Sequence, residues 1–295
     1  MRAGDWDAAW ALSDTERQRH PRQTQPSVPR HLQTIWDGSP LHSKRVLVRC
    51  YHGLGDTVQF IRFMPQLRQI ANEVSVWCQP KLIPLLQTAR GIDRLLPLHD
   101  GIPAAQYDVD IELMEVPYAL RTNLRTLPRH VPYFDIAPAG ARRATAAPLY
   151  VGVVWQSGDW DTRRCIDPEL MRALLQSTRN INWSIFQRGP ALAAWRDPSG
   201  IAAVPRLRGV LDEAAALREL DLLISVDTFS AHLAGALGVR TWTLLPFDSD
   251  WRWMEHRDDS PWYPTMRLFR QQRRGDWDEV LERVRTCLQT LVNME

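Results

Sequence analysis

Several features that would assign a protein class directly are scarce in this 295-residue sequence. Its four cysteines are scattered singly, without the C-x-x-C pairing of a zinc or redox site, which indicates buried free thiols. No window approaches the ~18 consecutive apolar residues of a membrane-spanning helix. The N-terminus also lacks the basic start and apolar middle of a secretory signal. We therefore expect a soluble, cytoplasmic protein with no transmembrane segment; peripheral attachment at the inner membrane is the alternative location.

Unopposed basic charge is also lacking, because the formal net charge is only +2. A sequence-independent grip on nucleic acid needs many basic residues on one face, so we expect no nucleic-acid partner. Lysine is almost absent, since only Lys44 and Lys81 are lysines and the other basic residues are arginines. A base-composition bias of the genome is the simpler explanation. The functional one is bidentate phosphate binding by the guanidinium fork.

The chain is long enough for two domains, each with its own core. Short β-rich runs alternate with helical stretches, which is typical of parallel sheets with crossover helices. Residues 137–148 are rich in small residues and prolines and predict a linker, so we expect an N-terminal Rossmann-like domain at 1–140 and a C-terminal one at 149–275. The predicted strands span 46–51, 73–78, 109–113, 150–156, 183–187, 222–227 and 240–247. The predicted helices span 57–70, 80–88, 167–177, 212–219, 229–237 and 276–292.

The stretch HGLGDTVQF, residues 52–60, follows the first predicted strand. Gly53 and Gly55 permit a tight strand-to-helix turn. Asp56 and Gln59 stand in the D-x-x-Q arrangement of a capping box, which predicts that Asp56 caps the helix. The functional alternative uses its position, because a carboxylate at the carboxyl end of a parallel strand can accept a proton from a substrate hydroxyl.

A second constellation is LLISVDTFSAHLAGALG, residues 222–238. A strand ends at Asp227, and Thr228 and Ser230 open a short helix whose free amides can bind a diphosphate. The hydroxyl groups would add donors. The alternative is that Asp227 and Thr228 only cap the helix, and that His232 is a packed histidine.

Polar residues also follow the strands at 150–156 and 183–187. Gln156 and Ser157 lead into a loop with Arg163 and Arg164, either of which could neutralise a leaving diphosphate; the alternative is two solvated surface arginines. Gln187 ends the next strand and is a weaker candidate for the same donor site.

Two further features lie near the C-terminus. Asp248-Ser249-Asp250 has the form of a D-x-D metal motif, but no third ligand is apparent, so we expect no metal. The aromatic, proline-rich run at 250–271 has no periodicity and predicts an ordered loop, where stacking on a nucleotide base is an option.

The sequence resembles the glycosyltransferase family 9, or heptosyltransferase-like, domain often found after tetratricopeptide repeats in bacterial proteins. Four segments carry the resemblance: HGLGDTVQFIRF, SVDTFSAHLAGALG, LLPFDSDWRW and DDSPWYPTMRLFRQ. The resemblance covers residue 29 to the C-terminus. It implies an α/β fold of GT-B architecture, with two Rossmann-like domains facing a cleft and the final helix, 276–295, packing back on the first domain. It also implies inverting, metal-independent transfer of a sugar, with heptose as one candidate, from a nucleotide diphosphate sugar and without a cofactor. The acceptor would be a glycan, lipid-linked or protein hydroxyl.

The resemblance also implies site residues. Asp56 matches the acid of the G-x-G-D loop, the proposed general base of heptosyltransferases. Asp227, Thr228 and Ser230 match the donor-diphosphate segment, with His232 as its histidine. Arg164 matches a phosphate-neutralising lysine, although the offset could equally select Arg163.

Two other functions remain open at this point. One is a module that binds a nucleotide sugar, or docks a partner, without catalysis. The other is a GT-B-like sugar-nucleotide epimerase, which would turn over donor without an acceptor.

Overall fold

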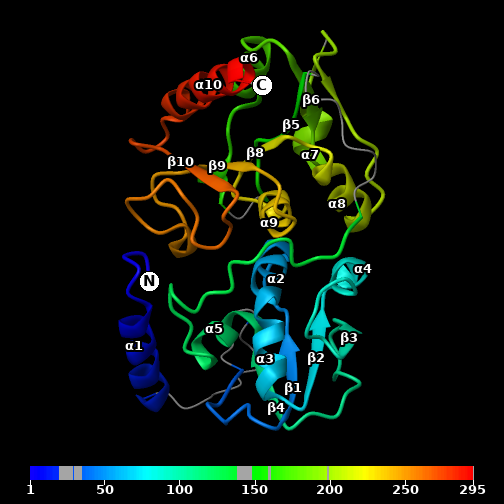
Figure 1. The fold of residues 1–295 in the computed structure, drawn as a ribbon, viewed down its shortest axis with the longest axis vertical. Coiled ribbons are helices and arrows are strands. Elements are labelled where there is room, and N and C mark those ends of the chain that lie inside the picture. Colours follow the sequence, from blue (N-terminus) through cyan, green and yellow to red (C-terminus); the bar gives the residue numbers. More distant parts are fainter. Residues whose placement is uncertain (20–28, 30–34, 138–147, 159–160, 198, 295) are drawn as a thin grey trace. The chain divides into compact units, whose positions relative to one another are not determined.

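The apolar runs of the sequence form the strands of two parallel β-sheets in a computed structural model of the chain (Figure 1). The structure describes residues 1–19, 29, 35–137, 148–158, 161–197 and 199–294. The chain divides into two compact units, Met1–Asp135 and Ile136–Glu295. The linker predicted at 137–148 falls at this division, but residues 138–147 lie outside the described part of the chain.

The first unit is built on a four-stranded sheet in the order β3-β2-β1-β4 with parallel neighbours throughout. Its strands are β1 (Arg45–Arg49), β2 (Glu73–Cys78), β3 (Arg94–Pro97) and β4 (Val109–Glu112). Its helices are α1 (Trp6–Arg19), α2 (Leu54–Phe60), α3 (Met64–Ile70), α4 (Ile83–Leu86) and α5 (Val116–Ala119), with 3-10 turns η2 (Ile61–Phe63), η3 (Pro80–Leu82) and η4 (Leu113–Glu115). The strand order reverses between β1 and β4, so the crevice at their carboxyl ends is where an α/β sheet binds ligands.

The second unit has a six-stranded sheet in the order β10-β9-β8-β5-β6-β7, again with parallel neighbours. Its strands are β5 (Leu149–Val154), β6 (Ile181–Ile185), β7 (Ala202–Ala203), β8 (Leu222–Val226), β9 (Thr241–Leu245) and β10 (Met266–Arg270). Its helices are α6 (Pro168–Gln176), α7 (Gly189–Ala194), α8 (Val210–Arg218), α9 (Phe229–Ala236) and α10 (Trp277–Met294), with 3-10 turns η5 (Thr162–Arg164) and η6 (Trp251–Trp253). Here the order reverses between β5 and β8, which places the expected ligand crevice at their carboxyl ends.

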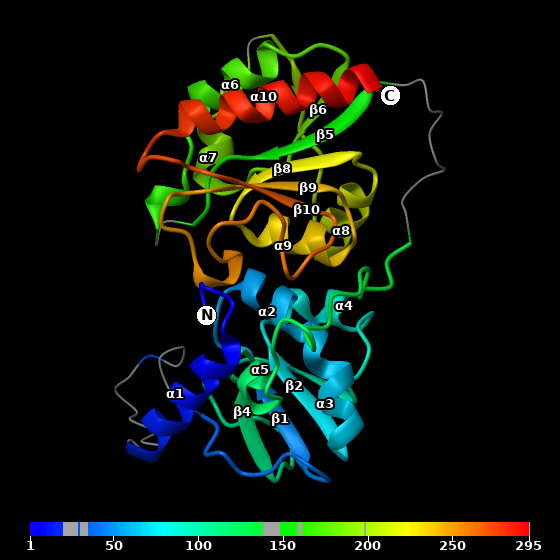
Figure 2. The same ribbon diagram turned by 60° about the vertical axis from the view of Figure 1, so that its left-hand side comes forward.

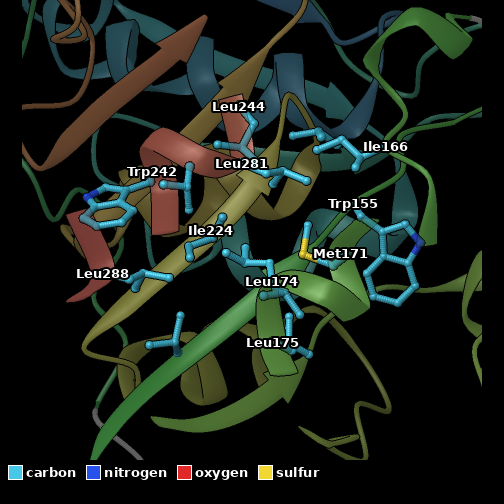
Figure 3. Packing of buried hydrophobic residues seen from close by; sticks show 14 of the residues in the cluster. Trp155, Ile166, Met171, Leu174, Leu175, Ile224, Trp242, Leu244, Leu281 and Leu288 are labelled. Atoms are coloured by element: carbon cyan, nitrogen blue, oxygen red, sulfur yellow. The ribbon is translucent and has the colours of Figure 1, made fainter. Parts of the chain in front are cut away.

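The resemblance implied that the last helix, α10, packs back on the first domain, and that contact stays a prediction. Within the second unit, α10 packs against α6 (Figure 2). Its apolar stripe, including Leu281 and Leu288, enters the core formed by the six-stranded sheet and α6 (Figure 3). Burial of this stripe explains the placement, because the sheet face and α6 supply the apolar surface that an amphipathic helix needs.

The other predicted strands and helices occur close to their expected positions, but three strands were missed. β3, β7 and β10 all lie at sheet edges. β7 is only two residues long, and arginines interrupt the apolar runs of β3 and β10, so all three give little sequence signal. The run 250–271 is therefore not a loop throughout, because it contains η6 and the edge strand β10.

Candidate functional site

The turn from β8 into α9 is the centre of the candidate site in the second unit. Thr228 is the N-cap of α9, and its Oγ1 accepts a hydrogen bond from the amide of Ala231 at 3.4 Å. The carbonyl oxygen of Thr228 accepts the amide of His232 at 3.2 Å. Because the first amides of a helix have no acceptor within it, this end of α9 has the features of an anion site. Thr228 thus serves as the cap, and its hydroxyl also lies 2.9 Å from that of Ser225.

Asp227, which precedes this cap, is buried among protein partners. Its Oδ2 accepts a hydrogen bond from Nε1 of Trp253 at 2.9 Å, and its Oδ1 lies 3.4 Å from Nε2 of His232. Burial alone would raise the pKa of the Asp227 carboxyl, but the hydrogen bond and charge of His232 and the charges of Arg252 and Arg164 hold it well below its ordinary value. A buried anion with these partners anchors the site and is not suited to direct contact with a diphosphate.

His232 follows the packed interpretation of the sequence. Its side chain is buried, its Nδ1 lies 3.0 Å from the hydroxyl of Tyr263, and its ring stacks on Trp253 with centroids 5.4 Å apart. A buried chain of contacts therefore runs from Tyr263 through His232 to Asp227. It fixes the first turn of α9 on the β8 strand.

The structure separates the two arginines that the sequence could not. Arg164, with a side chain 11% exposed, donates through Nη1 to the carbonyl oxygen of Asp227 at 3.0 Å. Arg163 pairs instead with Asp161, Nε to Oδ1 at 2.8 Å, and its side chain is 65% exposed. Arg164 is thus the cation that the loop after β5 holds at the start of α9.

Gln187 and Ser230, which the sequence analysis expected to contact a donor, make hydrogen bonds inside the protein. Oε1 of Gln187 accepts the amides of Trp155 and Gln156, at 3.1 and 2.9 Å, and its Nε2 donates to the carbonyl oxygens of Gln156 and Arg188. It ties the carboxyl ends of β5 and β6 together. The hydroxyl of Ser230 donates to Oε1 of Glu213 at 2.6 Å.

Glu213 links Ser230 to the surface. It is buried, and its Oε2 pairs with Nη2 of Arg188 at 2.5 Å. Burial raises the pKa of Glu213, against the opposing effects of Ser230 and Arg188. The hydrogen bond from Ser230 to Glu213 thus joins α9 to α8, and the ion pair with Arg188 joins α8 to the start of α7.

Gln156 and Ser157 do lie at the switch point, on the segment that leaves β5 toward Arg164. Both are partly exposed. The Ser157 hydroxyl donates to the carbonyl oxygens of Gly158 and Asp161, at 3.3 and 3.4 Å. Ser157 therefore shapes the loop, while its partial exposure leaves it accessible to a ligand.

The aromatic run after β9 was assigned too loosely from the sequence. Trp253, Trp262 and Tyr263 are fully buried, which makes them unsuited to stacking on a base. Trp253 and Tyr263 instead contact His232 of α9. The D-x-D carboxylates pair with arginines: Asp248 with Arg274 at 2.6 Å, and Asp250 with Arg252 at 2.9 Å. Within the described residues no group of three or more His, Cys, Asp or Glu side chains is placed to hold a metal ion.

Asp56 lies at the corresponding switch point of the first unit, but not as the helix cap. α2 begins at Leu54, Gly53 is its N-cap, and Asp56 is the third helical residue. Its Oδ2 accepts the amide of Gly53 at 2.9 Å. The predicted pairing of Asp56 with Gln59 was therefore misplaced by three residues, because the glycine turn lets the helix start earlier. The carboxylate is partly exposed.

Glu112, at the end of β4, is a neighbour of this site that the sequence did not single out. It is 3% exposed, its Oε2 accepts the amide of Met114 at 2.6 Å, and the same oxygen lies 3.6 Å from Nε2 of His52. Burial, together with the charges of Glu115 and Asp56, raises the pKa of Glu112 to about 8. Glu112 therefore carries a proton at neutral pH beside the ionisable Asp56.

Three solved structures that resemble this chain are bacterial glycosyltransferases. A glycosyltransferase of family 9 from Veillonella parvula superposes with a TM-score of 0.56 over 87% of this chain and 99% of its own, at 14% identity. The E. coli heptosyltransferase WaaC, solved with ADP, gives 0.51 over 85% of this chain and all of its own, at 13% identity. The iron-containing dodecameric glycosyltransferase TibC of enterotoxigenic E. coli gives 0.55 over 82% of this chain and 67% of its own, at 15% identity. The chain has the α/β fold of these glycosyltransferases.

Sequence comparison adds a relative at a higher sequence identity. Protein FlbA of Caulobacter vibrioides is 24% identical over 86% of this chain, and the chain spans about half of the length of that relative. No protein-family profile matches the chain. No helix in the described ranges is both long and apolar enough to cross a membrane. The tetratricopeptide-repeat context and the cytoplasmic location stay predictions.

Proposed function

We propose that the protein is a glycosyltransferase that moves a sugar from a nucleotide diphosphate sugar to an acceptor hydroxyl. The proposal depends mainly on the position of Arg164, whose guanidinium is held at the start of α9. The cation and the helix N-terminus converge on one point of the β5–β8 switch region, where they could bind the diphosphate and offset its charge as it leaves. The family 9 fold supports the same reaction class.

In the proposed site, the residues around Arg164 divide into two groups. Thr228 and the first amides of α9, together with Gln156 and Ser157, are placed to meet the donor. Asp227, His232, Ser230 and Gln187 hold those elements in position through the buried contacts described above. This assignment replaces the direct donor contacts expected for the second group.

Asp56 is the proposed general base. As the acceptor oxygen attacks the anomeric carbon, its proton passes to the Asp56 carboxylate, and the bond from that carbon to the diphosphate breaks with its electron pair going to the diphosphate. Attack opposite to the leaving group inverts the anomeric configuration. An ordinary aspartate, with a pKa of about 3.9, is a weak base, so the proton moves late, when positive charge has built up on the attacking oxygen.

The donor is proposed to be a nucleoside diphosphate sugar, with heptose as one candidate, and the acceptor a glycan, lipid-linked or protein hydroxyl. No metal is assigned to the reaction, because helix amides and Arg164 supply the positive charge.

The test is donor turnover. The protein is incubated with a panel of nucleotide diphosphate sugars, with and without cell extract as the acceptor source and with and without EDTA, and release of nucleoside diphosphate is measured. Extract-dependent release that survives EDTA is expected. A rise in melting temperature without consumption would instead identify a binding module. Release of nucleoside diphosphate without extract would identify a hydrolase, and conversion of one nucleotide sugar into another without such release, followed by chromatography, would identify an epimerase.

A further inference from the structure

The second unit contains a pocket of about 270 Å³ that none of the proposed donor contacts uses. It lies among the loop that carries η5, the segments that follow β9 and β10, and the start of α10. Its lining includes Arg163, Cys165, Phe247, Gln271, Arg274 and Trp277. Drug-sized ligands occupy roughly 300–1,000 Å³, so this volume suits a ligand of about one ring.

Gln271 is a buried polar side chain in the lining of the pocket. It is 3% exposed, and its Oε1 accepts the amides of Phe247 and Gly275, at 3.2 and 3.1 Å. Its buried Nε2 has no hydrogen-bond partner among the described residues. A buried amide nitrogen is costly to leave without an acceptor, so a ligand oxygen at this position would be stabilising.

The charged residues of the pocket are already neutralised. Arg274 pairs with Asp248 at 2.6 Å, and Arg163 pairs with Asp161 at 2.8 Å. An anionic ligand would therefore meet carboxylates together with the guanidinium groups. The paired guanidinium and carboxylate groups still offer several hydrogen-bond donors and acceptors, and these suit a neutral ligand with many hydroxyl groups.

Aromatic surface completes the pocket. Phe247 is 44% exposed, which is unusual for a large apolar side chain, and Trp277 also lines the cavity. The guanidinium of Arg274 lies over the Phe247 ring, 5.5 Å from its centroid. A sugar ring presents an apolar C–H face to such a ring and hydroxyl groups at its edge.

We propose that this pocket binds a single neutral sugar ring. The loop after β5 would then serve two ligand groups, since Arg164 faces α9 while its neighbours Arg163 and Cys165 line the pocket. The ring could be a unit of an acceptor glycan or the sugar of a donor, and binding to the pocket does not require that the protein catalyse transfer.

Cys165 provides a direct probe of occupancy. The intact protein is alkylated with iodoacetamide in the presence of neutral methyl glycosides, and mass spectrometry monitors the reaction. The glycoside concentration is set above the millimolar Kd expected for ligands of this size. Cys287, which is also partly exposed but lies outside the pocket, is the internal control. We expect a glycoside to slow alkylation at Cys165 and to leave Cys287 unchanged.

Three variants make the test specific. Phe247→Ala should weaken protection at least about fivefold, because the stacking surface is lost. Gln271→Glu keeps the oxygen that holds Phe247 and Gly275 but removes the Nε2 donor, and it should also weaken protection. Leu211→Ala removes a comparably exposed apolar side chain outside the pocket. In this variant a glycoside should protect Cys165 as well as it does in the wild type.

The source of the ring is resolved by adding nucleotides. If a glycoside still protects Cys165 in the presence of a saturating intact nucleotide sugar that does not itself protect, the ring belongs to an acceptor. If only nucleotide sugars protect, and nucleoside diphosphates do not, the ring belongs to the donor. Absence of protection by any sugar, or equal protection in Phe247→Ala, would overturn the proposal whatever the outcome of the turnover assay.

Discussion

Arg164 donates through Nη1 to the backbone carbonyl oxygen of Asp227 at 3.0 Å, and the same nitrogen lies 3.5 Å from the Asp227 carboxylate. The arginine is therefore fixed at the N-terminus of α9 by both the backbone and the side chain of one residue. The carboxylate also restrains His232 and Trp253. A single buried acid thus positions the cation, the helix and an aromatic brace together.

The first prediction concerns Arg164. Replacing it by Gln should weaken nucleoside diphosphate binding roughly 10- to 100-fold, because a charge-assisted hydrogen bond to phosphate contributes about 1.5–3 kcal/mol. Arg164→Lys should recover part of the affinity, since the charge is kept and the fork is lost. Calorimetric titration with a panel of nucleoside diphosphates measures the effect. Arg285→Gln, which removes a paired surface arginine of α10, is the control. Equal affinity in Arg164→Gln would exclude the assigned role.

The second prediction concerns Gly235, on α9. A Cβ at this position would lie 2.6 Å from the Tyr263 ring, so Gly235→Ala must displace the ring that contacts His232. Gly-to-Ala substitution within a helix normally stabilises by about 0.5–1 kcal/mol, but here we expect destabilisation of roughly 1–3 kcal/mol. Urea unfolding of the two proteins measures the difference.

Tyr263→Phe is the matched comparison, because it keeps the ring and removes only the hydroxyl. A smaller loss in this variant is expected. If Gly235→Ala is more stable than the wild type, the close packing of α9 on Tyr263 is refuted.

The turn from β8 into α9 could be predicted from the sequence because its signals are local. A continuous apolar run ends in Asp227-Thr228, and a helix rich in Ala and Leu follows immediately. The buried network on Asp227 could not be predicted in the same way. Trp253 and Tyr263 come from a segment without periodicity, well beyond the helix they support, and only the tertiary structure brings them to it.

The placement of α10 and the start of α2 show two other limits. The apolar stripe of α10 predicts that one face is buried, but it does not predict which surface buries it; in the structure that face enters the core of the second unit. Around Asp56 the sequence contained both elements of the helix start, two glycines and an acid. An acid at the N-cap and an acid at the third helical position, which accepts the amide of the N-cap residue, look the same in the sequence. Only the residue at which α2 begins distinguishes them.

The third prediction concerns Glu112 and pH. Its pKa is raised to about 8 in the folded chain, whereas in the unfolded chain it returns to about 4.5. Between these values the folded state holds a proton that the unfolded state has lost, so this residue makes the free energy of unfolding fall as pH rises through the window. The slope approaches about 1.4 kcal/mol per pH unit.

Glu112→Gln imitates the protonated acid and removes this dependence. Urea unfolding is measured at about pH 5, 6.5 and 8, which span the window. The free energy of unfolding of the variant should rise relative to that of the wild type as pH increases, because every other titrating group is common to both proteins. Parallel stability curves would mean that Glu112 is ionised in the folded protein.

The fourth prediction separates the two roles of Asp56. In Asp56→Asn the amide oxygen can still accept the Gly53 amide, so α2 should start at the same residue and the melting temperature should change little. The proton acceptor is lost, and removing a general base typically lowers kcat roughly 10²- to 10⁴-fold. Asp108→Asn, at a surface ion pair with Arg45, is the matched control and should retain turnover. Nucleoside diphosphate affinity should stay unchanged in both variants, because its contacts are assigned to the second unit. Full turnover by Asp56→Asn would reduce Asp56 to a helix-starting residue, whereas parallel loss of turnover and nucleotide binding would show that it acts through the fold and not on the acceptor.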